Sequence, residues 1–146
     1  MASIMQLEKM LLANPVVEKE PMFLGSLYGF DEKSGLAVLA SISFYSSSKE
    51  CLFDELPAVD FVVDDETVSV LGKGKGATQG GGHTFTFPQI EDGMCNDAID
   101  VFLPISKYIK VASAKRHIKV RAGKLRFELT RLHIAALNEM ARRIKK

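Results

Sequence analysis

Few of the residues that mark specialised proteins are present in this sequence. Its 146 residues include no tryptophan, three tyrosines and two cysteines, and the formal net charge is only +1 at neutral pH. Two cysteines are too few for a disulfide-rich secreted scaffold, and no apolar run approaches the roughly 20 residues of a membrane-spanning helix. The fractions of apolar residues, 47%, and of charged residues, 25%, are those of an ordinary globular domain. Length and composition therefore predict one domain with a core of its own.

The two cysteines do not form a recognisable motif. Cys51 and Cys95 lie far apart, and neither belongs to a C-x-x-C pair, so the usual spacings of a zinc site and of a thioredoxin-type site are absent. We predict two free thiols, with one disulfide as the alternative, because disulfides depend on the compartment as much as on spacing. The N-terminal stretch MASIMQLEKMLLANP lacks a basic leader followed by an unbroken apolar run. A cytoplasmic protein is therefore the default, and a mature secreted or periplasmic domain that has lost its leader would look the same.

Motifs for catalysis, cofactors and metals are also missing. The serines of YSSSKE stand in no G-x-S-x-G turn, and the acidic stretch EDGMCND lacks the order of a calcium loop. His83, His117 and His133 fall in different predicted elements, so we expect structural or surface histidines rather than metal ligands. These absences favour a protein without catalytic residues, cofactor or metal.

A glycine-rich stretch, GKGKGATQGGG, occupies residues 72–82 and holds six of the eleven glycines. It contains no G-x-x-x-x-G-K-[ST] motif, and a predicted strand follows it rather than a capped helix, so we predict a flexible loop. Lys73 and Lys75 could clamp an anion when this loop becomes ordered, and His83 stands at its end. An alternative function is accordingly a small hydrolase or ligand-binding enzyme built around this loop, His83 and nearby acidic residues.

The chain begins with an amphipathic pattern. Ser3 as N-cap, an apolar stripe that includes Leu11, and Pro15 as terminator predict a short helix, and NPVVEKEP follows as a linker. We therefore assign residues 1–20 to an N-terminal helix and linker and residues 21–146 to a single domain.

Strands and hairpins dominate the middle of the chain. The first predicted hairpin has the strands FLGSLYGF and LAVLASISFY on either side of DEKSG, where Gly35 can adopt the positive φ of a short loop. The second has the strands AVDFVV and TVSVL on either side of DDE. Two further strands, HTFTF and AIDVFLP, follow the glycine-rich stretch. Alternation places the apolar residues of a strand on one face, which we expect to face the core. In two of these strands that face consists of Leu36, Val38, Ala40, Ile42, Phe44, Val59, Phe61 and Val63.

Two helices are predicted in the last third. Pro104 opens a short helix in PISKYIKVASAK, and Thr130 caps LTRLHIAALNEMARRIKK, whose apolar stripe includes Ile134, Leu137 and Ile144. Short strands, helices and hairpin links predict an α+β fold, in which the C-terminal helix packs on a mainly antiparallel sheet. The order of LPISKYIKV, IKVRAGKLRFEL and ALNEMARRI also resembles the closing part of a pleckstrin-homology-like barrel, which is the alternative fold.

The segment HIKVRAGKLRFEL, residues 117–129, predicts a basic β-hairpin. A turn at its AG dipeptide places every apolar residue on one face, and on the other face Arg121 stands opposite Lys124 and Lys119 opposite Arg126. Like charges in directly opposed positions are destabilising unless a counter-charge is near. We therefore single out these four residues, the basic strip, as a candidate anion-binding or interface surface.

Charge is divided unequally along the chain. Residues 107–146 contain thirteen basic and two acidic residues, whereas residues 1–106 contain six basic and sixteen acidic ones. The near match predicts that acidic residues of the same chain or of a dimer mate balance the basic strip, and stacking aromatics are missing from the strip. We expect a non-enzymatic binding or assembly module, with a protein partner or a second copy of the chain as candidates. Binding of nucleic acid or of an anionic membrane surface through the strip is the second hypothesis.

Overall fold

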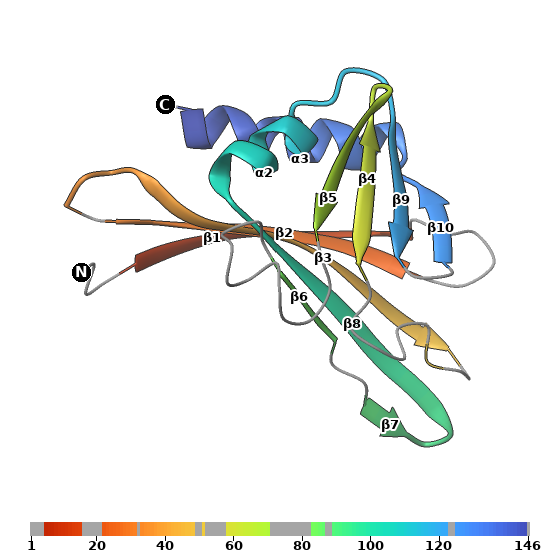
Figure 1. Cartoon of the computed structure of the whole chain (residues 1–146). Helices are drawn as coiled ribbons and strands as arrows, with labels where there is room; N and C mark the ends of the chain where they lie inside the picture. Colours follow the sequence, from red (N-terminus) through yellow and green to blue (C-terminus); the bar gives the residue numbers. More distant parts are fainter. Residues whose placement is uncertain are drawn as a thin grey trace.

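The computed structural model describes the backbone of residues 5–15, 22–31, 33–48, 51, 58–70, 83–86, 89–122 and 125–145, and their side chains except those of 5–15, 22, 30, 31, 38, 39, 48, 83–86 and 145. Its elements follow in the order β1 (Met5–Pro15), β2 (Met22–Asp31), β3 (Ala37–Ser48), β4 (Val59–Val63), β5 (Glu66–Val70), β6 (His83–Thr86), β7 (Gln89–Glu91), β8 (Met94–Leu103), α2 (Ile105–Ala112), β9 (Ile118–Ala122), β10 (Leu125–Glu128) and α3 (Arg131–Lys145) (Figure 1).

The described strands form two antiparallel sheets, and helices α2 and α3 pack on the same side of the larger sheet (Figure 1). The larger sheet has the strand order β1-β2-β3-β8-β6, with β7 also paired to β8, and the smaller sheet has the order β10-β9-β4-β5. Among the described strands no ladder of backbone hydrogen bonds joins the sheets, which contact each other through side chains and are not closed into a barrel. The predicted α+β class is confirmed, and the barrel alternative is wrong.

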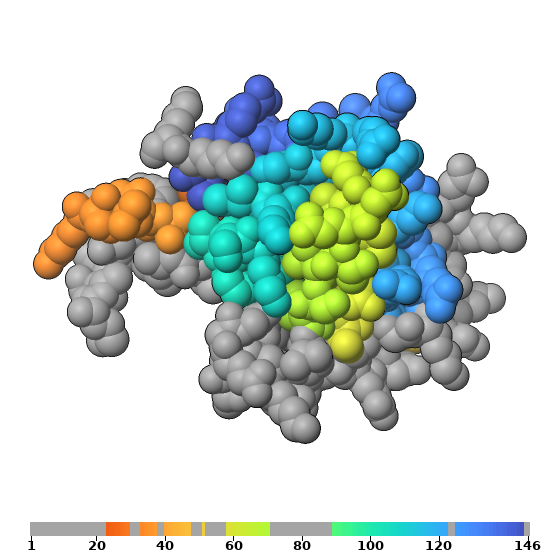
Figure 2. Space-filling view, turned by 45° about the horizontal axis from the view of Figure 1, so that its top comes forward, coloured from red at the N-terminus to blue at the C-terminus, as the bar shows by residue number. Residues whose placement is uncertain are grey.

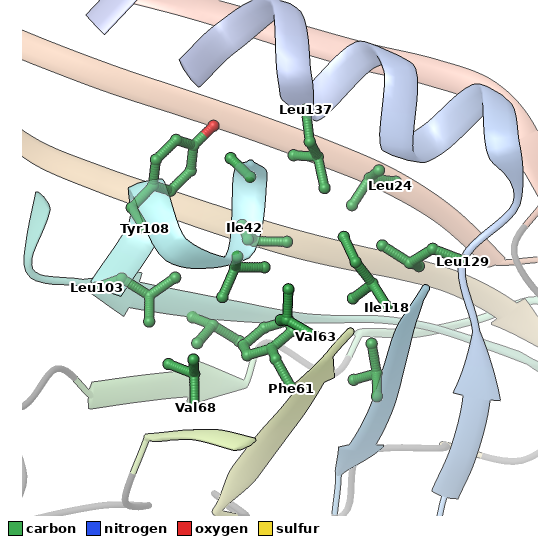
Figure 3. Close-up of a cluster of buried hydrophobic side chains, with 14 of the residues drawn as sticks. Leu24, Ile42, Phe61, Val63, Val68, Leu103, Tyr108, Ile118, Leu129 and Leu137 are labelled. Atoms are coloured by element: carbon green, nitrogen blue, oxygen red, sulfur yellow. The ribbon is translucent and has the colours of Figure 1, made fainter. Parts of the chain in front are cut away.

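The core lies between the two sheets and under the helices (Figure 3). Alternation along β3 buries Ala40, Ile42 and Phe44 completely. The ring centroid of Phe44 lies 6.4 Å from that of Phe61 in β4 and 5.0 Å from that of Phe127 in β10. Side chains from both sheets therefore form one continuous core.

Strand β3 begins one residue later than predicted, at Ala37 rather than at Leu36. Gly35 has a φ of 71°, as its place in the turn predicts. Leu36, which we predicted on the core face, is 68% exposed because it precedes β3 and does not share the alternation of that strand. The side chain of Val38 lies outside the described residues.

The C-terminal helix closes the core as predicted. In α3, Leu137 is fully buried and Ile134 is 7% exposed, while Ile144 packs against the core from its margin. The backbone N–H of His133 donates to Oγ1 of Thr130 at 3.3 Å, so Thr130 caps the start of the helix. Neither this helix nor any other in the described part of the chain is long and apolar enough to cross a membrane.

A buried polar contact joins α2 to the larger sheet. The hydroxyl of Tyr108 lies 2.6 Å from Oγ of Ser26 in β2, and that Oγ donates to the carbonyl oxygen of Ser41 in β3 at 2.9 Å. Burial raises the pKa of Tyr108 to about 12, so the phenol stays protonated over the whole physiological range. The contact gives α2 a fixed position over β2 and β3.

The N-terminal segment is a strand and not the predicted helix. β1 pairs antiparallel with β2, from Met5 opposite Asp31 to Leu11 opposite Gly25. The spacing of Leu7 and Leu11 also fits a helix, but an isolated helix of this length is only marginally stable in water. The edge of β2 provides hydrogen-bonding partners for the backbone of a whole strand, and this tertiary pairing decides the outcome.

Cys51 and Cys95 form a disulfide, so the prediction of two free thiols is wrong. The bridge joins residues 44 positions apart, with their Cα atoms at 5.2 Å. Its origin is the pairing of β3 with β8, which places Ser48 opposite Cys95 and thereby brings the residues that follow β3 close to β8. The spacing of the two cysteines along the chain does not reveal that the pairing of β3 with β8 brings them together.

Candidate functional site

The predicted basic hairpin forms, but its strands pair two residues away from the predicted register. β9 and β10 place Arg126 opposite Arg121 and Glu128 opposite Lys119. A shift of two residues leaves the same side chains on each face, so the apolar pattern cannot distinguish the two registers. Arg121 and Arg126 form the like-charge pair that results, and Lys124 lies outside the described residues.

Part of the basic strip contacts a carboxylate of the same chain. β9 lies between β10 and β4, and Asp60 of β4 stands opposite Arg121, with 3.6 Å between Oδ2 and Nη2. Ser69 of β5 donates to Oδ1 of Asp60 at 2.7 Å. The side chains of Arg121 and Asp60 are 44% and 36% exposed, so the ion pair contributes at most about 1 kcal/mol. The acidic β4–β5 hairpin thus lies directly beside the basic β9–β10 hairpin.

Two further ion pairs extend this arrangement toward α2. Oε1 of Glu66 lies 3.0 Å from Nζ of Lys110, and Oδ2 of Asp65 lies 3.8 Å from Nη2 of Arg116. All four side chains are 60% exposed or more, so water screens both pairs and each contributes little stability. The acidic β4–β5 hairpin therefore compensates one basic residue within α2, Lys110, and one that follows it, Arg116.

Asp64 holds the backbone of those basic residues in one conformation. Asp64 and Asp65 form the β4–β5 turn with φ values of 46° and 78°, which aspartate tolerates better than most residues. The Asp64 carboxylate accepts hydrogen bonds from the backbone N–H groups of Lys115, Arg116 and His117 at 2.7, 2.8 and 2.9 Å. These bonds, with that from Lys115 the largest contribution, lower the pKa of Asp64 from 3.8 to about 2. Figure 2 shows the yellow-green β4–β5 hairpin packed against the cyan segment that follows α2.

Helix α3 holds the same segment from the other side. The side-chain amide of Asn138 donates to the carbonyl oxygens of Ala112 at 2.6 Å and of Ala114 at 3.1 Å. Residues 113–117, which we call the connecting segment, therefore have hydrogen bonds to the β4–β5 turn at one end and to α3 at the other. A backbone fixed in this way restricts the space that its side chains can sample.

The connecting segment forms one wall of an open groove of about 720 Å³. The first turns of α3 form the opposite wall, and the end of β10 closes one side. We call it the basic groove, because its lining includes two arginines and a lysine against a single carboxylate. The lining residues are Lys115, Arg116, His117, Glu128, Leu129, Arg131, Ile134, Ala135 and Asn138.

The charges of the basic groove are only partly compensated. Nδ1 of His117 lies 3.1 Å from Oε1 of Glu128 across the end of the hairpin. Over the part of the chain that the structure describes, no carboxylate lies within 4.0 Å of the charged nitrogens of Lys115 or Arg131. Arg131 is the first residue of α3, where the helix dipole adds positive potential. The groove therefore presents a net positive, concave surface.

The other residues singled out from the sequence lie elsewhere. Lys73 and Lys75 are outside the described residues, and His83 is the first residue of strand β6 rather than part of a loop. The side chain of His83 is not among those described. His133 is fully buried with Nδ1 at 2.8 Å from Oγ1 of Thr130, a structural contact at the start of α3.

Sequence reasoning missed the basic groove. The adjacent Lys115 and Arg116 were visible as a basic run, but nothing along the chain indicates that Arg131 and Asn138 lie across from them. That juxtaposition depends on how α3 packs over the core.

No known protein family, no curated protein and no solved structure matches this chain.

Proposed function

We propose that this protein is a non-enzymatic binding module whose basic groove binds an acidic segment of a partner protein. The observation that carries the proposal is the arrangement of Lys115, Arg116 and Arg131 around one concavity, on a backbone held by Asp64 and Asn138. A concave surface concentrates the field of its charges. A backbone that is already ordered lowers the entropic cost of binding.

The lining of the groove favours a peptide over a nucleic acid. Exposed Ala135 adds an aliphatic group to the wall formed by α3, the largely buried side chains of Leu129 and Ile134 lie beneath the groove, and the lining includes no phenylalanine, tyrosine or tryptophan. Proteins that bind single-stranded nucleic acids usually stack the bases on aromatic side chains. We therefore expect a ligand in which carboxylates flank an aliphatic side chain.

The basic strip has a different role in this proposal. Arg121 has Asp60 beside it, and Lys119 stands opposite Glu128 in the hairpin. Its described members, Lys119, Arg121 and Arg126, are exposed on the sheet and do not line the basic groove. We propose that it is balanced mainly by acidic residues of the same chain and contributes to the sheet rather than to partner binding.

The test is a titration with a fluorescent peptide of alternating glutamate and leucine, followed by anisotropy at low and moderate salt. The paired charge reversal Lys115→Glu with Arg131→Glu should weaken binding at least tenfold, equivalent to about 1.4 kcal/mol. The matched control is Arg126→Glu on the basic strip, which should change the affinity less than twofold.

Duplex DNA, single-stranded DNA and vesicles with anionic lipids are titrated in parallel. Tighter binding of DNA, with log K falling by about 0.9 per phosphate contact for each tenfold rise in salt, and its loss in Arg126→Glu would contradict the proposal. The proposal also fails if the acidic peptide binds the wild-type protein and the doubly reversed variant equally well, or binds neither.

A further inference from the structure

Three potential metal ligands meet beside β8, away from the basic groove. The two sulfur atoms of Cys51 and Cys95 and a carboxylate oxygen of Asp97 all lie within 4.8 Å of one another. Cys95 and Asp97 are each 2% exposed, and Cys51 is half-buried. In the disulfide form the sulfur atoms bond to each other and do not offer thiolate ligands.

Sheet pairing assembles this cluster. Cys95 and Asp97 are two residues apart in β8 and share one face of the strand. The register of β8 with β3 places Ser46 opposite Asp97, and Oγ of Ser46 donates a hydrogen bond to the Asp97 carboxylate. Second-shell hydrogen bonds of this kind orient a carboxylate for metal binding.

We propose that reduction of the disulfide creates a zinc site whose protein ligands are Cys51, Cys95 and Asp97. Thiolate sulfur favours zinc over magnesium or calcium, and carboxylate oxygen is an accepted third ligand. Three protein ligands leave the fourth position of a tetrahedral ion to water, the pattern of a site that is open to exchange. The oxidised chain holds a disulfide, and the reduced chain holds the metal.

The chemistry balances with a dithiol reductant. The reductant transfers two electrons and two protons to the disulfide, so the bond between the two sulfurs breaks, two cysteine thiols form, and the reductant becomes a disulfide. Zn²⁺ then displaces both thiol protons to solvent and binds the two thiolates. Binding is consequently favoured by higher pH and competes with oxidation.

The distances require only local adjustment. Ligand atoms around a tetrahedral zinc ion lie roughly 3.4–3.8 Å apart, given Zn–S and Zn–O bonds of about 2.3 and 2.1 Å. The sulfur atoms must therefore move apart once the bond between them is broken, and the Asp97 oxygen must approach them by at most about 1.4 Å. Rotation of the cysteine side chains provides movements of this size without displacing β8 from its sheet.

The experiment uses Co²⁺ as a spectroscopic substitute for zinc. The full chain is reduced with dithiothreitol, freed of reductant under anaerobic conditions and titrated with Co²⁺. We expect one equivalent to bind, with a sulfur-to-cobalt charge-transfer band and the intense visible bands of tetrahedral cobalt, and one equivalent of Zn²⁺ to remove both. The oxidised protein should show neither band.

Two variants and one chemical modification complete the test. Asp97→Asn should weaken cobalt binding at least tenfold, while Asp92→Asn, an exposed carboxylate in the adjacent turn, should leave it unchanged. Should Asp97→Asn fail to fold, alkylation of both thiols in the reduced wild-type chain tests the site without a mutation and should abolish binding. Reduced wild-type protein that takes up no cobalt, cobalt bands that survive alkylation, or a folded Asp97→Asn variant that binds as tightly as wild type would each overturn the proposal.

Discussion

Leu137 is the side chain whose truncation tests the packing of α3 most directly. It is fully buried on the inner face of the helix, where Figure 3 shows it directed into the cluster that includes Leu24, Ile42 and Tyr108. Replacing Leu137 by alanine removes about three carbon groups from the core, which costs roughly 2.4 kcal/mol in transfer free energy. A cavity that closes only partly adds about 1–2 kcal/mol, so we expect a loss of about 3.5–4.5 kcal/mol in the free energy of unfolding.

The assay is urea denaturation followed by circular dichroism, with the disulfide intact, and the midpoint should fall while the slope m stays constant. Leu132→Ala is the matched control, because Leu132 belongs to the same helix and is 63% exposed, so its truncation should cost less than about 0.5 kcal/mol. The reasoning is refuted if Leu137→Ala costs less than about 0.5 kcal/mol, or if both substitutions cost the same.

Three further predictions concern the hairpins and the disulfide. Arg126→Glu replaces the like-charge pair with Arg121 by an opposite-charge pair, so the free energy of unfolding should rise by up to about 1 kcal/mol; a fall in the urea midpoint would contradict the observed register. Cys51→Ser with Cys95→Ser opens a connection of 44 residues and should cost roughly 2–4 kcal/mol; an unchanged thermal midpoint under oxidising conditions would contradict this. Folding lowers the pKa of Asp64 from 3.8 to about 2, so the stabilising effect of this carboxylate is fully present well above pH 4 and is lost as the pH falls toward 2. The difference in unfolding free energy between wild type and Asp64→Asn should therefore shrink over that pH range. A difference that stays constant would refute the assignment.

Local patterns predict much of this fold because they report local physics. Alternation along LAVLASISFY and AVDFVV requires only that one face of each strand be apolar, and the burial of Ile42, Phe44 and Phe61 follows. Thr130 and the stripe that includes Leu137 similarly specify a capped, amphipathic helix. Each of these features is decided within about a dozen residues of the chain.

The sequence by itself determined most of the strands between residues 22 and 128, the C-terminal helix, the α+β class and the division of charge along the chain. Only the tertiary structure decided that residues 5–15 form a strand, because the edge of β2 provides its hydrogen bonds. It also decided the register of the β9–β10 hairpin, since a slip of two residues preserves the apolar face. The basic groove and the cluster around Cys95 depend on contacts between distant segments, in which Lys115 meets Arg131 across a groove and Cys51 meets Cys95 through sheet pairing. Proximity in space between residues far apart in sequence arises from packing the whole chain, and no periodicity within one segment encodes it.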